Sequence, residues 1–408
     1  MARKVVITGM GCVSGLGADL SATWKSLLEG QTAIRPIVTP AVNQTVLAVE
    51  SPGAPAVSDA LARLGKHFSE KQIAAVDPFS SFGAAATLEA LQDAGLWGDA
   101  ERLARAAILY GSASGGNASI EAAYQRVFDA RFPNIHPMTI PRYMTSASVS
   151  NLSMLFGIRG HTLALSSACA SSAHAIAEAM YFIRAGRGNI VVTGGSDASI
   201  TFGSLYGWKA LQAMAPDTCR PFSAQRNGMV IGEGGATLIL EDEEHARARG
   251  ARIYAEVAGA ASNADARHIT QPDPENAAEA IRAAHREAGL SFDAPILYSA
   301  HGTGTKLNDK AETTALKLAY ASSLARHRVI ATKSAHGHML GGTGAMEYML
   351  AIMAMREGIA PPILNYLEPD PECDLPLVLN PEPFACDAVV SSSFAFGGLN
   401  SVLIAKRY

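Results

Sequence analysis

The sequence predicts an α/β fold in which helices cover both faces of a sheet. Short β-branched runs alternate along the chain with alanine-rich helical stretches, which is the order of elements typical of layered α/β proteins. Several predicted strands are apolar on both faces, as in a sheet that is covered on both sides. A length of 408 residues with 48% hydrophobic and 17% charged residues fits two large units with a sizeable core.

The individual elements follow from their local patterns. β-branched and apolar runs predict strands at residues 4–8, 107–110, 163–165, 190–193, 237–240 and 388–393. Helical periodicity predicts helices at residues 20–28, 79–94, 277–288 and 310–319. Gly95 ends the second of these helices, and Asp273 with Pro274 begins the third.

Two segments suggest an internal duplication. Residues 166–177 and 329–346 each combine the end of a strand, a turn of small residues and a helix. The alternative is ordinary α/β alternation without a repeat. We place the boundary between the two units near residue 250, so that they comprise residues 1–250 and 251–408.

Composition and charge exclude several classes of protein. The apolar content excludes a disordered chain, and a net charge of −4 provides no basic field for nucleic acid. No apolar run reaches the roughly 18 residues of a membrane-spanning helix, and the N-terminus lacks a secretory signal. The five cysteines are scattered without a CxxC pair, which argues against a disulfide framework. We expect a cytoplasmic protein that binds neither nucleic acid nor membrane.

Cys169 is a candidate nucleophile. It lies in the small-residue segment Ser167-Ala168-Cys169-Ala170-Ser171, between a predicted buried strand and a helix. A helix N-terminus stabilises a thiolate and lowers the pKa of the thiol, and the Cys169 amide is placed to donate to an oxyanion. The alternative is an inert buried cysteine. The stretch from Tyr143 to Ala177 carries Arg159 as its one Lys, Arg, Asp or Glu, which predicts a deeply buried core.

Two further segments bring imidazoles to strand ends. His301 follows a strand and precedes Gly302-Thr303-Gly304-Thr305, an open loop with hydroxyl groups at the strand edge where α/β folds bind ligands. Lys333 precedes His336 and His338 at another strand end. Because a buried ammonium needs a counter-charge, we expect Glu312 to pair with Lys333. A hydrogen-bonded loop histidine remains the alternative for His301, and a metal half-site remains the alternative for His336 and His338.

A fourth segment joins aromatic residues to glycines. Phe394-Ala395-Phe396-Gly397-Gly398-Leu399-Asn400 follows a strand. It indicates either a tight turn between strands or a mobile aromatic gate whose backbone amide completes an oxyanion hole.

Taken together, these four ordered motifs resemble those of the β-ketoacyl-acyl carrier protein synthases, the condensing enzymes related to synthases I and II. The resemblance spans the whole chain and implies a thiolase fold, with five layers (αβαβα) built from two related halves. It implies that Cys169 takes an acyl group from an acyl carrier protein. It also implies that His301 and His338 then promote decarboxylation of malonyl-carrier, whose enolate attacks the acyl group in a Claisen condensation.

The resemblance also implies the supporting roles. Lys333 with Glu312 orders the histidines, and the amides of Cys169 and Phe396 form the oxyanion hole. The substrate-binding residues that it implies are Thr303, Thr305, His268, Thr270 and Phe394. No metal or cofactor is expected, because phosphopantetheine arrives on the acyl carrier protein. The second expected partner is another subunit, in a homodimer or in a heterodimer with a chain-length-factor-like subunit.

Several residues depart from the family pattern. Ala395 and Leu399 replace a usual glycine and threonine, Lys306 stands in the His301 loop, and His336 replaces a small or hydroxyl residue. These departures make a specialised polyketide or polyene pathway as plausible as housekeeping fatty acid synthesis. Two alternatives stay open, an inactive subunit that shapes an acyl tunnel and a thiolase-like enzyme acting on coenzyme A thioesters.

Overall fold

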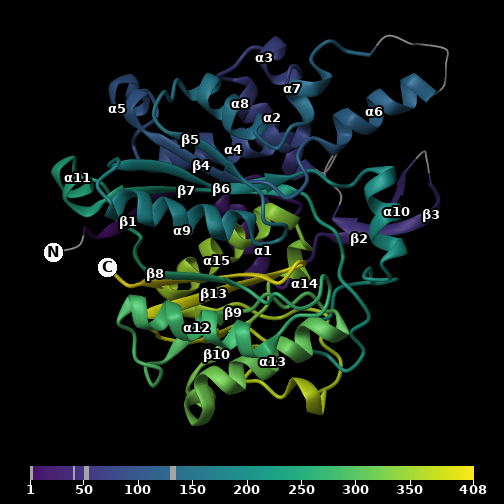
Figure 1. Ribbon diagram of the computed structural model, residues 1–408, viewed down its shortest axis with the longest axis vertical. Helices are drawn as coiled ribbons and strands as arrows, with labels where there is room; N and C mark the ends of the chain where they lie inside the picture. The colour runs from purple at the N-terminus through teal and green to yellow at the C-terminus, as the bar shows by residue number, and fades with distance from the viewer. Residues whose placement is uncertain (1–2, 40–41, 50–54, 129–134) are drawn as a thin grey trace.

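The protein is a five-layered α/β/α/β/α structure. The computed structural model describes residues 3–39, 42–49, 55–128 and 135–408, without side chains between residues 37 and 57. Figure 1 shows two sheets, one above the other, with a helical layer between them and one on each outer side. The predicted α/β class and the five-layered fold are therefore confirmed.

The two sheets have the same internal order. The strands of the first half are β1 (Val5–Ser14), β4 (Ala107–Gly111), β5 (Thr162–Leu165), β6 (Ile190–Asp197) and β7 (Gly234–Asp242). Those of the second half are β8 (Ala255–Ala264), β9 (Ile296–Ser299), β10 (Arg328–Ile330), β13 (Ala388–Ala395) and β14 (Leu399–Lys406). The order β1-β7-β6-β4-β5 in one half corresponds to β8-β14-β13-β9-β10 in the other. The duplication suggested by residues 166–177 and 329–346 is thus visible in the topology.

The strand directions correspond as well. In each half the three outermost strands are parallel, and the remaining pairings are antiparallel. The two halves join where β1 pairs with β8 through Val6↔Glu256 and Ile7↔Ala255. The sheet is therefore mixed, and helices cover both of its apolar faces as the sequence predicted.

The helices form the other three layers (Figure 1). α9 (Ser171–Arg184) and α15 (Thr343–Glu357) lie between the sheets, and most of their side chains are buried. α4 (Pro78–Asp93), α5 (Ala100–Arg105) and α8 (Ala147–Phe156) cover the outer face of the first sheet together with α2 (Pro55–Gly65). α12 (Pro274–Ala288) and α13 (Lys306–Tyr320) cover the outer face of the second.

Smaller elements complete the fold. The remaining helices are α1 (Leu20–Leu28), α3 (Glu70–Ala74), α6 (Asn117–Phe128), α7 (Thr139–Tyr143), α10 (Phe202–Ala210), α11 (Glu243–Ala248) and α14 (Lys333–His336). Two small sheets pair β2 (Ile34–Thr39) with β3 (Val42–Val49) and β11 (Ile359–Ala360) with β12 (Glu382–Pro383). Among the described residues, no helix has both the length and the apolar character needed to cross a membrane.

The stretch from Tyr143 to Ala177 is not the uniformly buried core that its composition predicted. Met154 and Leu163 are 71% and 50% exposed, and β5 is the last strand of its sheet, with one edge unpaired. Burial becomes continuous only from Cys169 onward, where α9 enters the middle layer. The scarcity of charge in this stretch therefore reflects an exposed apolar face as well as a core.

Candidate active site

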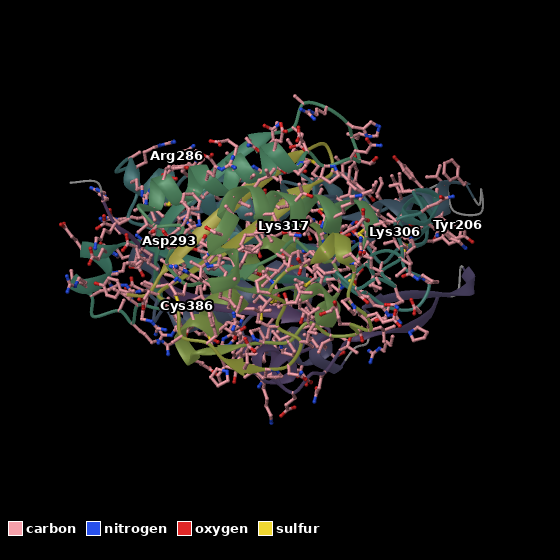
Figure 2. The ribbon with its side chains drawn as sticks, turned by 90° about the horizontal axis from the view of Figure 1, so that it is seen from below. Tyr206, Arg286, Asp293, Lys306, Lys317 and Cys386 are labelled. Atoms are coloured by element: carbon pink, nitrogen blue, oxygen red, sulfur yellow. The ribbon has the colours of Figure 1, made fainter. Side chains whose placement is uncertain are left out.

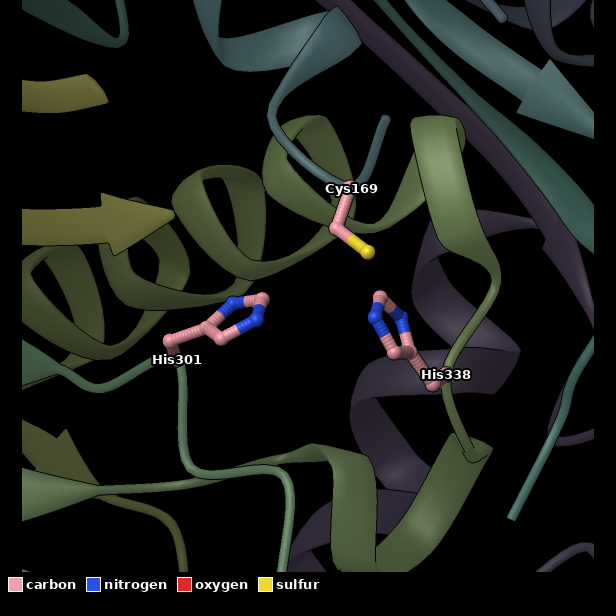
Figure 3. Close-up of side chains that lie close together, drawn as sticks. All are labelled: Cys169, His301 and His338. Atoms are coloured by element: carbon pink, nitrogen blue, oxygen red, sulfur yellow. The ribbon is translucent and has the colours of Figure 1, made fainter. Parts of the chain in front are cut away.

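Cys169 lies at a sharp turn between β5 and α9. The preceding residue, Ala168, has a φ of +50°, a conformation that is costly for a residue with a Cβ. The Ser171 hydroxyl stabilises this turn, because it donates to the Ala168 carbonyl at 2.6 Å and accepts from the Ser167 amide at 2.9 Å. The turn directs the sulfur out of the sheet towards the second half of the molecule (Figure 3).

The backbone amides of Phe396 and of Cys169 itself are both directed at the Cys169 sulfur. These are the two donors named for the oxyanion hole, and they come from different halves of the chain. Burial nevertheless raises the pKa of the Cys169 thiol to about 11, while Lys333 and the two amides lower it in part. The expected fall in the thiol pKa is therefore wrong, because desolvation outweighs the helix N-terminus and the nearby charges. A nucleophilic role for Cys169 would consequently require transfer of the thiol proton.

His301 and His338 face the sulfur from the second half (Figure 3). One atom from each of Cys169, His301 and His338 belongs to a cluster whose members all lie within 4.8 Å of one another. The two imidazole rings are nearly perpendicular at 85°, with centroids 5.5 Å apart. Burial, and to a lesser degree Lys333, hold the pKa of both histidines well below the usual range, so both rings are neutral.

Lys333 lies behind His301 and pairs with Glu347 instead of Glu312. Its ammonium is 2.7 Å from the Glu347 carboxylate, with both side chains almost fully buried, and it also donates to the His301 carbonyl. The predicted Lys333–Glu312 pair is wrong. Glu312 accepts instead from the backbone amides of His301 at 2.7 Å and of Gly302 at 2.8 Å. It therefore anchors the backbone of the histidine loop.

The contacts of His301 determine which of its nitrogens carries the proton. The Lys333 ammonium, which can only donate, is 3.3 Å from Nδ1 of His301. Nδ1 is therefore the acceptor, and Nε2 carries the proton. A metal-bound histidine typically donates its other N–H to a carboxylate or carbonyl, and here that position faces a cation. This arrangement fits a hydrogen-bond donor better than a metal ligand, although the cluster of one thiol and two imidazoles has a suitable size.

His338 has one nitrogen without a partner. Its Nδ1 is 3.0 Å from the Thr343 hydroxyl, and its Nε2 is buried without a hydrogen bond. A buried polar atom in this state is costly unless a ligand satisfies it. The His338 side chain lines the cavity described next.

The three residues lie in a cavity of about 480 Å³. Thr303, Thr305, His268, Thr270 and Phe394, the five residues expected to bind substrate, all line it, as does Phe396. The lining contains one lysine, Lys306, and three histidines but no aspartate or glutamate. The cavity therefore favours anionic or neutral ligands over cations.

Trp208 was missed by sequence reasoning and lies beside the aromatic gate. Its ring centroid is 5.8 Å from that of Phe396, and both side chains line the cavity near Cys169. No pattern in α10 singled out this tryptophan, because a half-buried tryptophan on a helix is more often a packing residue.

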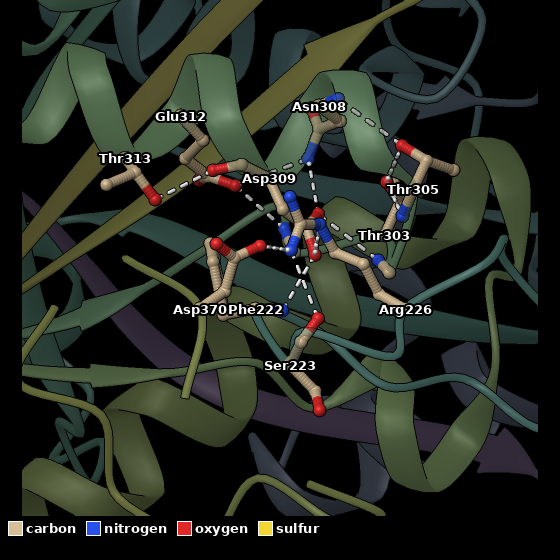
Figure 4. A network of polar contacts seen from close by, with 12 residues as sticks. Phe222, Ser223, Arg226, Thr303, Thr305, Asn308, Asp309, Glu312, Thr313 and Asp370 are labelled. Atoms are coloured by element: carbon tan, nitrogen blue, oxygen red, sulfur yellow. Dashed lines mark hydrogen bonds and ion pairs between the residues drawn. The ribbon is translucent and has the colours of Figure 1, made fainter. Parts of the chain in front are cut away.

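A second buried network supports the histidine loop (Figure 4). Asp309 accepts from the amides of Phe222 at 2.8 Å and Gly304 at 3.2 Å, and it lies 4.0 Å from the Arg226 guanidinium. Arg226 also pairs with Asp370, although it is only 4% exposed. The network ties the loop after His301 to two distant parts of the chain. Asp309 directly precedes the helix predicted at residues 310–319 and was not among the candidate site residues.

Comparisons with known proteins agree with this site. Residues 2–246 match the family model for the N-terminal domain of β-ketoacyl synthase, and residues 254–367 match the model for its C-terminal domain. The chain is 40% identical to nodulation protein E of Rhizobium leguminosarum bv. trifolii over the full length of both. It is 32% identical to 3-oxoacyl-[acyl-carrier-protein] synthase 2 of Staphylococcus aureus (strain COL), over 100% of this chain and 99% of the relative.

Solved structures give the same result. The ishigamide ketosynthase/chain length factor superposes with a TM-score of 0.92 at 31% identity, covering all of both chains. A β-ketoacyl synthase from Burkholderia phymatum STM815 superposes with a TM-score of 0.89 at 32% identity, again over all of both chains. The chain belongs to the β-ketoacyl synthase family and is a condensing enzyme of the acyltransferase class.

Proposed function

We propose that this enzyme joins two carrier-bound acyl units with Cys169 as the covalent acyl acceptor. The Cys169 sulfur attacks the carbonyl carbon of a carrier thioester, and the oxyanion is held by the amides of Cys169 and Phe396. The carbon–sulfur bond to the carrier then breaks. The carrier thiol leaves with the proton that the Cys169 thiol gives up, so the charge balances.

In the second half-reaction the two histidines act on a malonyl thioester. The bond to the carboxylate breaks, CO2 leaves, and the electron pair forms an enolate whose oxygen accepts from Nε2–H of His301 and His338. The enolate carbon attacks the acyl group on Cys169, and the Cys169 sulfur leaves as a thiolate that takes up one proton from solvent. A single preorganised donor of this kind is worth about 3 kcal/mol.

One observation carries the proposal, namely the cluster of the Cys169 sulfur and two neutral imidazoles, with two amides directed at the sulfur. The tautomer that Lys333 imposes on His301 and the unpartnered Nε2 of His338 place two donors where an enolate oxygen needs them. We infer that Lys333 and Glu312 are positioning residues for His301, acting on its ring and on its backbone respectively.

We propose that the substrates arrive on the phosphopantetheine arm of an acyl carrier protein. Thr303 and Thr305 supply hydroxyl groups along the cavity, and the absence of carboxylates from its lining suits an arm with a phosphodiester and a malonyl carboxylate. Leu211, Ile269 and Leu307 line the cavity and are 54%, 68% and 57% exposed, beside Lys306. In Figure 2, Lys306 lies at the end of the molecule that also carries Tyr206 of α10. This exposed apolar rim supports docking of the carrier at this end.

We also propose a second subunit on the unpaired edge of β5. That edge and its neighbour α8 expose Leu163 and Met154, an apolar surface that a second sheet edge covers well. One similar structure is described as a ketosynthase/chain length factor. Another shows a type II polyketide synthase acyl-carrier protein in complex with its ketosynthase. The first supports a heterodimer and the second supports an acyl-carrier partner, and a homodimer is the other arrangement that the β5 edge allows.

The rival functions are less well supported. An inactive tunnel-shaping subunit has no use for a nucleophile with two oxyanion donors. A thiolase-like enzyme calls for a second cysteine at the site, but Cys169 is the one cysteine among the residues that line the described cavity. The greater identity to nodulation protein E than to 3-oxoacyl-[acyl-carrier-protein] synthase 2 favours a specialised acyl product.

The test is intact-protein mass spectrometry after incubation with a panel of acyl-carrier thioesters, with Cys169→Ala as the control. We expect an acyl adduct on the wild-type enzyme alone, followed by CO2 release and a two-carbon longer product when malonyl-carrier is added. Absence of the adduct in the presence of candidate partner subunits would favour the inactive subunit. An adduct formed from coenzyme A thioesters but never from carrier thioesters would favour the thiolase-like enzyme.

A further inference from the structure

His336 is a buried histidine that the mechanism above does not use. It is fully buried at the end of α14 and does not line the cavity. Its Nδ1 lies 2.8 Å from the carbonyl oxygen of Gly337, and its Nε2 lies 2.8 Å from the Thr332 hydroxyl. A carbonyl oxygen only accepts, so Nδ1 carries the proton and Nε2 accepts from Thr332. The His336 imidazole thus links the Thr332 side chain to the carbonyl of Gly337.

The turn that His336 spans separates two fixed parts of the site. On one side, Lys333 is held by Glu347 and by His301. On the other side, the backbone of His338 donates to the Val230 carbonyl at 2.7 Å and accepts from the Gly232 amide at 2.8 Å.

Gly337 joins these two parts. Its φ of +70° and ψ of −173° lie in a region that favours glycine. The peptide that follows it carries the carbonyl bonded to His336 at one end and the His338 amide bonded to Val230 at the other. The hydrogen bond from His336 restrains the carbonyl of that peptide.

We propose that His336 is a positioning residue that holds the Gly337 peptide and thereby fixes His338 relative to the Lys333–His301 pair. The inference rests on the proposed function, in which His301 and His338 donate together to one enolate oxygen. Decarboxylation depends on the distance between these two rings. Acylation of Cys169 depends instead on the amides of Cys169 and Phe396, so a loosened turn affects the two half-reactions unequally.

The chain contains a matched control. His285 in α12 is 1% exposed and makes the same two kinds of bond, from Nδ1 to the Leu290 carbonyl at 3.1 Å and from Nε2 to the Tyr320 hydroxyl at 3.0 Å. It lies in the outer helical layer, away from the cavity. Replacing either histidine by phenylalanine keeps a ring and removes both hydrogen bonds, so the two variants bear a similar structural cost.

The experiment measures the rate of Cys169 acylation and the rate of malonyl decarboxylation separately in His336→Phe, His336→Asn and His285→Phe. We expect His336→Phe to slow decarboxylation about tenfold while acylation changes by no more than about twofold. His336→Asn retains an N–H donor near the Nδ1 position and should recover most of the loss. His285→Phe should leave the ratio of the two rates unchanged. Thr332→Val removes only the hydroxyl group that donates to Nε2 of His336. It should lower the ratio of the decarboxylation rate to the acylation rate by less than His336→Phe does. It replaces that variant in the test if His336→Phe does not fold.

An equal fall of both rates in His336→Phe, or a ratio that moves as much in His285→Phe, overturns the positioning role. Failure of His336→Asn to improve on His336→Phe has the same consequence. A wild-type enzyme that neither takes up an acyl group nor releases CO2 is a different result, because it overturns the proposed function itself.

Discussion

The buried pair of Lys333 and Glu347 should make one carboxylate far more important for stability than its neighbour. Their side chains are 1% and 0% exposed, so neither charge has access to water. Replacing Glu347 by Gln leaves the ammonium buried without its counter-charge, and breaking such a pair costs about 3–5 kcal/mol. For a chain of 408 residues, the unfolding entropy is about 0.9 kcal/mol per kelvin near 60 °C. The expected fall in Tm is therefore about 4–6 °C.

A double-mutant cycle separates this pair from the other buried glutamate. In a Lys333→Met background the ammonium is absent and the Glu347 carboxylate is the buried group without a partner, so Glu347→Gln should not lower the Tm further. Glu312 binds backbone amides and not the lysine, so Glu312→Gln should cost the same in both backgrounds. The assay is thermal unfolding of the three single variants, the two double variants and wild type under identical buffer, protein concentration and scan rate.

The outcome that refutes this reasoning is specific. If Glu347→Gln lowers the Tm equally in both backgrounds, the pair contributes no coupling. If instead Glu312→Gln loses its effect in the Lys333→Met background, Lys333 pairs with Glu312 in solution, as the sequence alone suggested.

Three further predictions test other parts of the molecule. Gly341→Ala should lower the free energy of unfolding by about 1–3 kcal/mol, because the added Cβ would lie 2.5 Å from the amide nitrogen of Ala113. Gly207→Ala should be tolerated, because the space around Gly207 is open. Thermal unfolding of the two variants tests the difference. Burial lowers the pKa of His327 to about 4, so the folded state binds fewer protons than the unfolded state and stability falls as the pH drops from 6.5 to 4. His327→Phe should reduce this loss of stability by up to about 3 kcal/mol, measured as unfolding free energy in a series of acidic buffers. Acylation of Cys169 should change the intrinsic fluorescence through Trp208, and a change of equal size in Trp208→Phe would contradict that assignment.

Sequence reasoning located the parts of the site that depend on local order. Cys169 follows a strand and precedes a helix, and His301 follows a strand, so both positions are readable from hydrophobic patterns and small residues. The fold class and the duplication were readable for the same reason, because they repeat a local pattern twice. The direction of the strands could not be predicted in this way, since burial on both faces does not distinguish parallel from antiparallel pairing.

The features of the site that the sequence did not predict depend on contacts between distant segments. Glu312 and Glu347 are both candidates for Lys333 in the sequence, and the choice follows from how α13 and α15 pack. Glu347 did carry a signal, because it is the one acid in the otherwise apolar helix α15 before Glu357, and an isolated buried acid requires a partner. The raised pKa of Cys169 likewise follows from burial by segments that the local sequence does not contain.

The duplicated topology explains why the chemistry assembles where it does. Cys169 follows β5 and precedes α9, while His338 follows β10 and precedes α15, which are the corresponding elements of the two halves. The two helices meet in the middle layer, where the amide of Ala345 donates to the Ser172 hydroxyl at 2.9 Å. A Cβ on Gly344 would lie 3.1 Å from that of Ala173, so glycine permits this close approach. One half therefore supplies the proposed nucleophile and the other supplies the proposed proton donors, and these side chains come together because small residues allow the equivalent ends of both halves to meet.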